Sequence, residues 1–235
     1  PREEARAFQA RLDAGLSPEE LAKRLGLKQP WRVAERTNLL KLATTNTSYL
    51  SSLKRNTRYQ INLSRRRYES SYGTLRLDFA NSSRQALKYF AEAGRLHLDR
   101  WSDSGFLNQY FVDFHNRFIE KYFDSGLVDI ARITAGNHIV AIIYNIIFNR
   151  NVYFYLQGLQ PEADGKLKPG LTAHAILIEH YLDKNMKSYD FMGGYSQYKK
   201  QLSATDDELL IVKIQKPLLK FRLENMARRI KRRLL

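Results

Sequence analysis

The chain has 235 residues, no cysteine and a formal net charge of +15 at pH 7. The missing cysteine excludes disulfides, thiolate metal sites and a cysteine nucleophile, and it fits a reducing cytoplasm, where we expect the protein. Its 43% hydrophobic residues suffice for a packed core, and no apolar run approaches the roughly 18 residues that cross a bilayer. The charge favours a polyanionic partner, whether nucleic acid, an anionic membrane or a phosphate-rich donor.

Three short helices are predicted in the first 42 residues. The first covers residues 3–14, and the second follows an S-x-x-E capping box formed by Ser17 and Glu20 and ends at Gly26. The third covers residues 29–42, with a proline in its first turn. Three short helices joined by tight turns are typical of a helix-turn-helix, although any three-helix packing unit has the same pattern.

Residues 43–52 are small and polar, and we expect a linker there, followed by a larger domain over residues 53–235. The predicted elements are a basic helix over 51–71, a strand over 74–80, helices over 83–101 and 108–126, three strands within 127–159, a helix over 170–185, strands over 188–194 and 208–215, and a basic helix at the end of the chain. Turn signals split the three central strands, which predicts an antiparallel meander. The fold class expected is therefore α/β or α+β.

A basic loop precedes the helix predicted over residues 170–185. It contains Lys166, Lys168 and Pro169, and Gly170 follows directly. Exposed N–H groups and the helix dipole both favour an anion at such a position, and a glycine lets a phosphate approach the backbone. An ordinary connection between a strand and a helix can carry the same residues, so the loop alone does not identify the site.

No metal site is predicted, because His115, His138 and His180 lack the spacing of metal-binding motifs. The chain also shows no evident pair of catalytic carboxylates of the kind that hydrolyses sugars.

Six runs occur in order over residues 52–214: SLKRNTRYQINLSRRRYE, LHLDRW, FVDFHNRFIEKYFDSGLVDIARI, VYFYLQGL, KLKPGLTAHAILIEHYLDKNMKSYDFMGG and YKKQL. They resemble the GNAT superfamily and, more narrowly, the CelD/BcsL-type acetyltransferases that are related to the FemAB aminoacyl transferases. The resemblance implies a GNAT-like, mixed, largely antiparallel sheet flanked by helices. It also implies direct transfer of an acyl group from a thioester, usually acetyl-CoA, to an amine. The family normally has a substantial N-terminal half, whose place residues 1–52 take here.

The resemblance also implies roles for particular residues. The donor pyrophosphate would lie on Lys166, Lys168, Gly170 and Leu171, and the pantetheine along Tyr155, Leu156 and Gln157. The candidates for acid and base catalysis are Tyr198, Tyr195, Asp190, His97 and His174. Among these, Tyr198 is favoured as the acid with Tyr195 second, and Asp190 or His97 as the base, because the leaving thiolate must gain a proton and the amine must lose one. Each of these residues can equally be part of the core.

The N-terminal run EEARAFQARLDAGLSPEELAKRLGLKQPWRVAERTNLLKL is similar to the helix-turn-helix of ParB-type partition proteins over about residues 2–42. That similarity implies DNA recognition by Gln29, Trp31, Arg32 and Arg36. The leading hypothesis is thus an N-acyltransferase that uses acyl-CoA and is positioned on nucleic acid. One alternative is a non-catalytic DNA-binding protein on a GNAT-like scaffold, and a second is a FemAB-like transferase that uses aminoacyl-tRNA.

Overall fold

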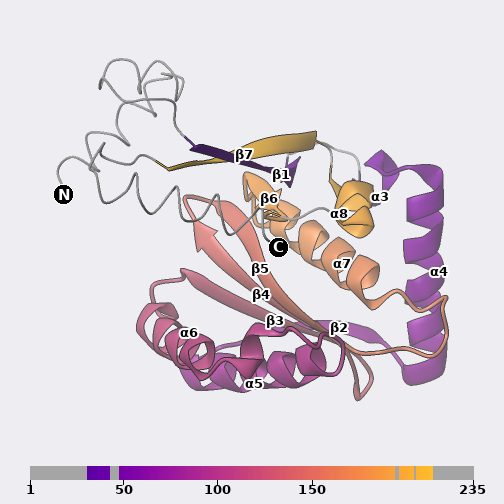
Figure 1. Ribbon diagram of the computed structural model, residues 1–235. Coiled ribbons are helices and arrows are strands. Elements are labelled where there is room, and N and C mark those ends of the chain that lie inside the picture. The colour runs from indigo at the N-terminus through magenta and orange to yellow at the C-terminus, as the bar shows by residue number, and fades with distance from the viewer. Residues whose placement is uncertain (1–30, 43–47, 194–195, 204, 214–235) are drawn as a thin grey trace, which may run out of the picture. The chain divides into compact units, whose positions relative to one another are not determined.

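The computed structural model describes residues 31–42, 48–193, 196–203 and 205–213 (Figure 1). The chain divides into two compact units, of which one comprises residues 1–35 and 208–235 and the other residues 36–207. The second unit contains all the described helices and the strands around which the candidate site is built.

A mixed sheet organises this unit, and its strands follow the order β2-β3-β4-β5-β6-β1, of which β1 belongs to the unit from residue 36 onward. The strands are β1 (Trp31–Lys41), β2 (Leu75–Phe79), β3 (Val128–Ala135), β4 (His138–Phe148), β5 (Asn151–Leu159), β6 (Ser188–Asp190) and β7 (Thr205–Lys213). Strands β2 to β5 pair antiparallel, β6 pairs parallel with β5, and β1 pairs antiparallel with β6. The expected mixed, largely antiparallel sheet with flanking helices is confirmed.

Tight turns separate β3, β4 and β5, as the sequence predicts for a meander. Gly136 between β3 and β4 has φ +54°, and a Cβ there would lie 2.1 Å from the backbone oxygen of Tyr72, so the position requires glycine. Asn149 and Arg150 between β4 and β5 also have positive φ. The predicted antiparallel meander is therefore confirmed.

Helices cover both faces of the sheet. Figure 1 shows α4 (Arg55–Tyr72) and α7 (Pro169–Asp183) on one face, and α5 (Ser83–Leu98) and α6 (Gln109–Tyr122) on the other. Each pair buries its own apolar cluster against the strands. No helix in the described ranges is long and apolar enough to cross a membrane. The short α3 (Tyr49–Ser52), η1 (Gly105–Leu107) and α8 (Gln197–Leu202) were not predicted, because they are too short to show a helical period.

Local signals explain where α5 and α6 begin. The Ser82 hydroxyl accepts from the Gln85 amide at 3.3 Å, and the Asn108 side chain accepts from the Tyr110 amide at 3.0 Å. These side chains satisfy N–H groups that the first helical turn leaves unpaired.

The third predicted helix is wrong, because residues Trp31–Lys41 form the strand β1. Residues Leu39–Lys41 pair with Ser188–Asp190. The short β6 would otherwise expose a row of backbone groups on that side, and pairing with β1 outweighs the local helical propensity of the sequence. Trp31, Arg32 and Arg36 therefore lie on a strand and not on a recognition helix. The first two predicted helices, Gln29 and the basic C-terminal helix lie outside the described residues.

Candidate functional site

Strand β5 extends well beyond the point where its neighbour β6 stops pairing with it. The two strands pair only between residues Asn151–Tyr153 and Ser188–Asp190, whereas β5 continues along β4 to Leu159. Within the described part of the chain, residues 154–159 therefore have a strand partner on the β4 side alone. A strand edge of this kind offers N–H and C=O groups to an extended ligand.

A β-bulge interrupts β5 in this stretch. Asn145 of β4 is paired with Phe154 and Tyr144 with Leu156, so Tyr155 is the extra residue. Bulges redirect side chains, and they are frequent next to active sites. Here Phe154 contacts His174 of α7 on one face of the sheet, while Tyr155 contacts His115 of α6 on the other.

On the α7 face, four side chains form a continuous chain of hydrogen bonds. The Tyr189 hydroxyl lies 2.9 Å from Nδ1 of His174, Nε2 of His174 lies 3.2 Å from Oε1 of Gln157, and Nε2 of Gln157 lies 3.4 Å from the Tyr198 hydroxyl. The amide oxygen of Gln157 can only accept, so Nε2 of His174 carries the proton and Nδ1 accepts from Tyr189. Each group thus donates to the next, and the Tyr198 hydroxyl proton is left for a further acceptor.

Burial keeps this chain uncharged at neutral pH. It lowers the pKa of His174, which is fully buried, to about 3, and the charge of Lys199 acts in the same direction. Burial also raises the pKa of Tyr198 to about 12, although the Gln157 amide and the charge of Arg100 oppose this effect.

The α6 face carries a second polar pair, which the sequence did not reveal. Nε2 of the buried His115 lies 2.9 Å from the hydroxyl of Tyr155, whose side chain is 39% exposed. Burial lowers the pKa of His115 to about 4, so the ring is neutral at pH 7. Its Nδ1 is buried and has no hydrogen-bond partner in the described ranges. The two residues are 40 positions apart, and no local spacing could have linked them.

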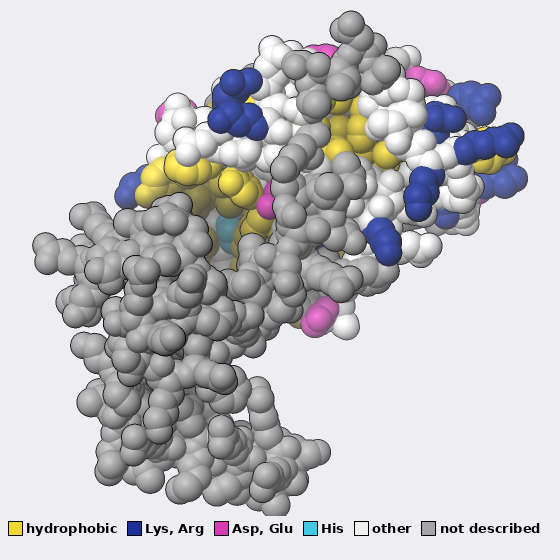
Figure 2. Space-filling model, turned by 90° about the horizontal axis from the view of Figure 1, so that it is seen from above, with side chains coloured by type: hydrophobic (Ala, Val, Ile, Leu, Met, Phe, Trp, Pro, Cys, Tyr) yellow, Lys and Arg dark blue, Asp and Glu magenta, His cyan; other side chains and the backbone are white. Residues whose placement is uncertain are grey.

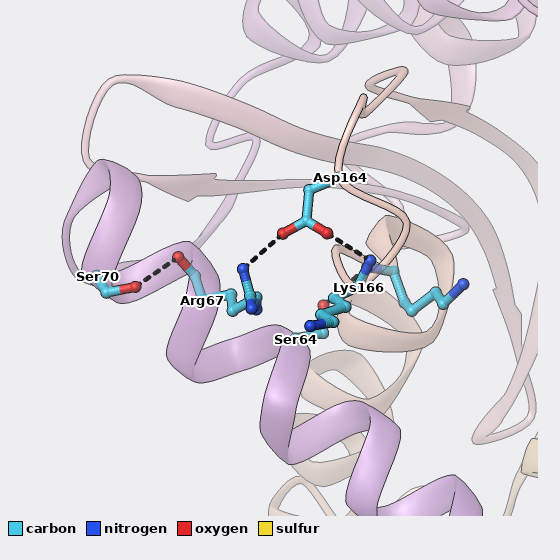
Figure 3. A network of polar contacts seen from close by, with 6 residues as sticks. Ser64, Arg67, Ser70, Asp164 and Lys166 are labelled. Atoms are coloured by element: carbon cyan, nitrogen blue, oxygen red, sulfur yellow. Dashed lines mark hydrogen bonds and ion pairs between the residues drawn. The ribbon is translucent and has the colours of Figure 1, made fainter.

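The basic loop ahead of α7 is held against α4 (Figure 3). Arg67 of α4 forms an ion pair with Asp164 at 2.8 Å, and the second carboxylate oxygen of Asp164 accepts from the Lys166 amide at 2.8 Å. The hydrogen bond from Lys166, followed by the charge of Arg67, lowers the pKa of Asp164. Ser64 accepts from the Lys168 amide, also at 2.8 Å.

The N-terminus of α7 is left open by these contacts. Lys168 occupies the N-cap position, and its side chain does not cap the helix. The amide groups of Gly170 and Leu171 lie in the first turn, where a helix has no internal acceptor for them and its dipole is positive. The side chains of Lys166 and Lys168 are exposed. The loop therefore has the elements of an anion site beside the far end of β5.

The remaining predicted residues are more dispersed. Asp190 ends β6 and accepts from the Met192 amide at 2.7 Å. His97 on α5 packs against Trp101 in a tilted arrangement, with ring centroids 4.4 Å apart, and burial lowers the pKa of His97. Tyr195 lies outside the described residues. The structure thus joins Gln157, His174 and Tyr198 by hydrogen bonds.

Figure 2 shows hydrophobic side chains around a hollow in which a histidine is visible. In the described segments, no group of three or more His, Asp or Glu side chains could hold a metal ion.

Several solved structures share the fold at low sequence identity. FemX matches with a TM-score of 0.55 at 13% identity, over 76% of this chain and 60% of that chain. L-PGS from Bacillus licheniformis matches with a TM-score of 0.53 at 11% identity, over 85% of this chain and 66% of that chain. The C-terminal domain of a putative lysylphosphatidylglycerol synthetase from Agrobacterium fabrum matches with a TM-score of 0.51 at 11% identity, over 79% and 62%.

The chain thus spans less than two thirds of each of these structures, and the likeness concerns the fold. No curated protein matches the chain. The family model of the acetyltransferase (GNAT) domain matches residues 55–200, which is more than half of the sequence. The matched region includes α4 to α7, β2 to β6 and the loop ahead of α7. The chain therefore belongs to the acetyltransferase (GNAT) domain family.

Proposed function

We propose that the chain is an N-acyltransferase that takes its acyl group from an acyl-CoA bound along β5 and at the N-terminus of α7. The observation that carries this proposal is that β5 and β6 stop pairing after Tyr153 and Asp190. The helix that follows β5 in the chain, α7, has an N-terminus that no described side chain caps. In this proposal, the free edge of β5 and the N-terminus of α7 contact the same acyl-CoA.

The two halves of the donor suit these two features. The amides of pantetheine can pair with the free backbone groups of residues 154–159, as an added strand would. The pyrophosphate suits the amides of Gly170 and Leu171, with Lys166 and Lys168 supplying positive charge. This part of the proposal fixes the direction of the donor along β5.

The reaction needs an acid and a base. The amine nitrogen forms a bond to the acyl carbon as the carbon–sulfur bond breaks, the amine gives a proton to the base, and the thiolate receives one from the acid. Tyr198 suits the acid because its hydroxyl is protonated at pH 7 and Gln157 donates to it, so the hydroxyl proton is not used by Gln157. His97, whose lowered pKa keeps it neutral, and Asp190 are the candidates for the base, and Tyr195 is the second candidate for the acid.

His174 has a different part in this proposal. Both ring nitrogens of His174 already have hydrogen-bond partners, and the ring is fully buried. It therefore cannot take a proton from the amine substrate without breaking these hydrogen bonds. We assign it to holding Gln157 and Tyr198 in position.

Calorimetric titration with acetyl-CoA, a longer acyl-CoA and free CoA tests the proposal. We expect all three to bind, because the phosphates and pantetheine are common to them, with affinities that differ only through the acyl group. If none of the three binds, the proposal is wrong.

A second candidate keeps the transfer and changes the donor to aminoacyl-tRNA. The net charge of +15 favours it, and so does the fold shared with FemX, given the resemblance to FemAB transferases. Competition separates the two candidates: a tRNA donor would displace bound acyl-CoA or bind in its place, whereas an acyl-CoA enzyme would bind acyl-CoA whether or not tRNA is present.

A further inference from the structure

Helix α4 has one buried side and one exposed side with a distinct composition. Ile61, Ser64 and Tyr68 are buried against the sheet and α7. The opposite side presents Arg55, Tyr59, Asn62 and Arg66, at steps of four, three and four residues, and we call these four residues the α4 stripe. At 1.5 Å per residue the stripe is about 17 Å long.

The two arginines of the α4 stripe are not neutralised within the described segments. Their neighbours on the flanks are, since Arg65 pairs with Glu179 at 2.7 Å and Arg67 with Asp164 at 2.8 Å. No described carboxylate lies within ion-pair distance of Arg55 or Arg66. Figure 2 shows Lys and Arg side chains gathered at the end of the molecule that α4 occupies. An anionic partner would therefore meet positive charge there without first displacing a carboxylate.

An exposed aromatic ring lies between these arginines. The side chain of Tyr59 is 58% exposed, and Asn62 beside it is exposed as well. Arginine, asparagine and an aromatic ring are the groups that contact phosphates and stack on bases in single-stranded nucleic acid. The α4 stripe has no aliphatic side chain that could enter a lipid layer, so a membrane surface suits it less well.

We propose that the α4 stripe binds single-stranded nucleic acid, with Arg55 and Arg66 on phosphates and Tyr59 stacked on a base between them. The inner side of the same helix holds the loop of the donor site, because Ser64 accepts from the Lys168 amide. A bound strand would thus lie next to the acyl-transfer site. This inference rests on the charge and exposure of α4 and holds whichever donor the site uses.

Two matched double variants test the proposal. Arg55→Gln with Arg66→Gln removes two exposed charges eleven residues apart on α4, and Arg84→Gln with Arg95→Gln removes two exposed charges at the same separation on α5. Within the described part of the chain, these four arginines form a single ion pair, the weak and exposed contact of 3.9 Å between Arg95 and Asp99. Both variants should therefore fold, which unfolding in urea verifies.

The probes are fluorescent 12-nucleotide RNA and DNA strands of one sequence, titrated by anisotropy at several salt concentrations. We expect the α4 variant to bind about tenfold more weakly near 0.1 M salt, and its plot of log K against log salt to be shallower by about 1.4, the value for two phosphates of a single strand. The α5 variant should match the wild type. Tighter binding of one of the two strands would identify RNA or DNA as the partner.

A third variant addresses the aromatic ring. Tyr59→Ala should weaken binding at least about fivefold while leaving the salt slope unchanged, since stacking releases no counterions. Equal losses in the α4 and α5 double variants would overturn the proposal, because they would show a diffuse charge effect. The proposal would also be overturned if neither the RNA nor the DNA strand bound, or if vesicles of anionic lipid bound more strongly than both strands.

Discussion

The two faces of β5 hold polar groups in different ways. On the α7 face, Gln157 belongs to a hydrogen-bonded chain in which the buried Tyr189 donates to the buried His174, His174 donates to Gln157, and Gln157 donates to Tyr198. On the α6 face, Tyr155 is 39% exposed, and its partner His115 has a buried nitrogen, Nδ1, to which no described residue forms a hydrogen bond. The difference indicates that the polar groups on the α7 face hold β5 in place, whereas those on the α6 face can form further contacts with a ligand.

Replacement of His174 tests the structural part of this comparison and should have the largest effect on stability. His174→Leu leaves the buried Tyr189 hydroxyl and the Gln157 amide oxygen without partners, which should lower the free energy of unfolding by about 3 kcal/mol. Urea unfolding measures the loss. His180→Leu on the same helix is the control, because His180 is partly exposed and contacts the rings of Phe79 and Tyr181, and it should cost less than about 1 kcal/mol. Equal losses would contradict a structural role for the buried chain.

A second polar group on the α7 face, the carboxyl of Asp129, should make the stability of the protein depend on pH. Burial raises the pKa of Asp129 to about 6, although the hydrogen bond from Tyr181 opposes it. The unfolded chain has the lower pKa, so between about pH 4 and 6 the folded state binds more protons and stability falls as pH rises. Asp129→Asn keeps an acceptor for Tyr181 and should gain about 2 kcal/mol on the wild type between these pH values.

Unfolding in urea at pH 4 and pH 7, for Asp129→Asn and the wild type, measures this difference. Other groups titrate in the same range, but they are common to both proteins and cancel. A stability difference that is the same at both pH values would show that the Asp129 carboxyl titrates normally.

The α6 face should respond to substitution mainly in ligand binding. Tyr155→Phe removes one partly exposed hydroxyl, so the free energy of unfolding should fall by about 1 kcal/mol or less, while acyl-CoA should bind roughly two- to tenfold more weakly. Calorimetry and urea unfolding together separate the two effects. The neighbouring Tyr144→Phe is the control, since its hydroxyl is buried and has no hydrogen-bond partner among the described residues, so its loss should lower neither stability nor affinity. If Tyr144→Phe weakens binding as much, the two faces do not differ as we describe.

Much of the fold was predictable from local patterns. The meander, α4 to α7 and β2 follow from apolar periods and turn residues such as Gly136, which report on the backbone locally. The strand β1 was not predictable, because its conformation depends on β6, about 150 residues later in the chain. The same applies to α3 and α8, which are short and are stabilised by tertiary contacts, as in the hydrogen bond from Tyr49 to the backbone oxygen of Leu202.

The site was predictable in part. The resemblance to GNAT proteins selected Gln157, His174 and Tyr198, which the structure joins by hydrogen bonds. Their roles as acid, positioning group or donor contact remain predictions. Neither the Tyr155 bulge nor the His115 pair could be derived from sequence, since each depends on the register between strands or on contact between distant elements.

The most direct test of the central claim is calorimetric titration of acetyl-CoA into Gly170→Asp and Gly170→Asn. The two side chains have nearly the same shape, and among the described residues a Cβ at this position would meet the Leu159 side chain alone, at 3.4 Å, so both variants should fold. The account predicts that the carboxylate abolishes binding by occupying the phosphate position, while the amide largely retains it. Binding of equal strength to both variants would show that the donor phosphates do not lie at the N-terminus of α7.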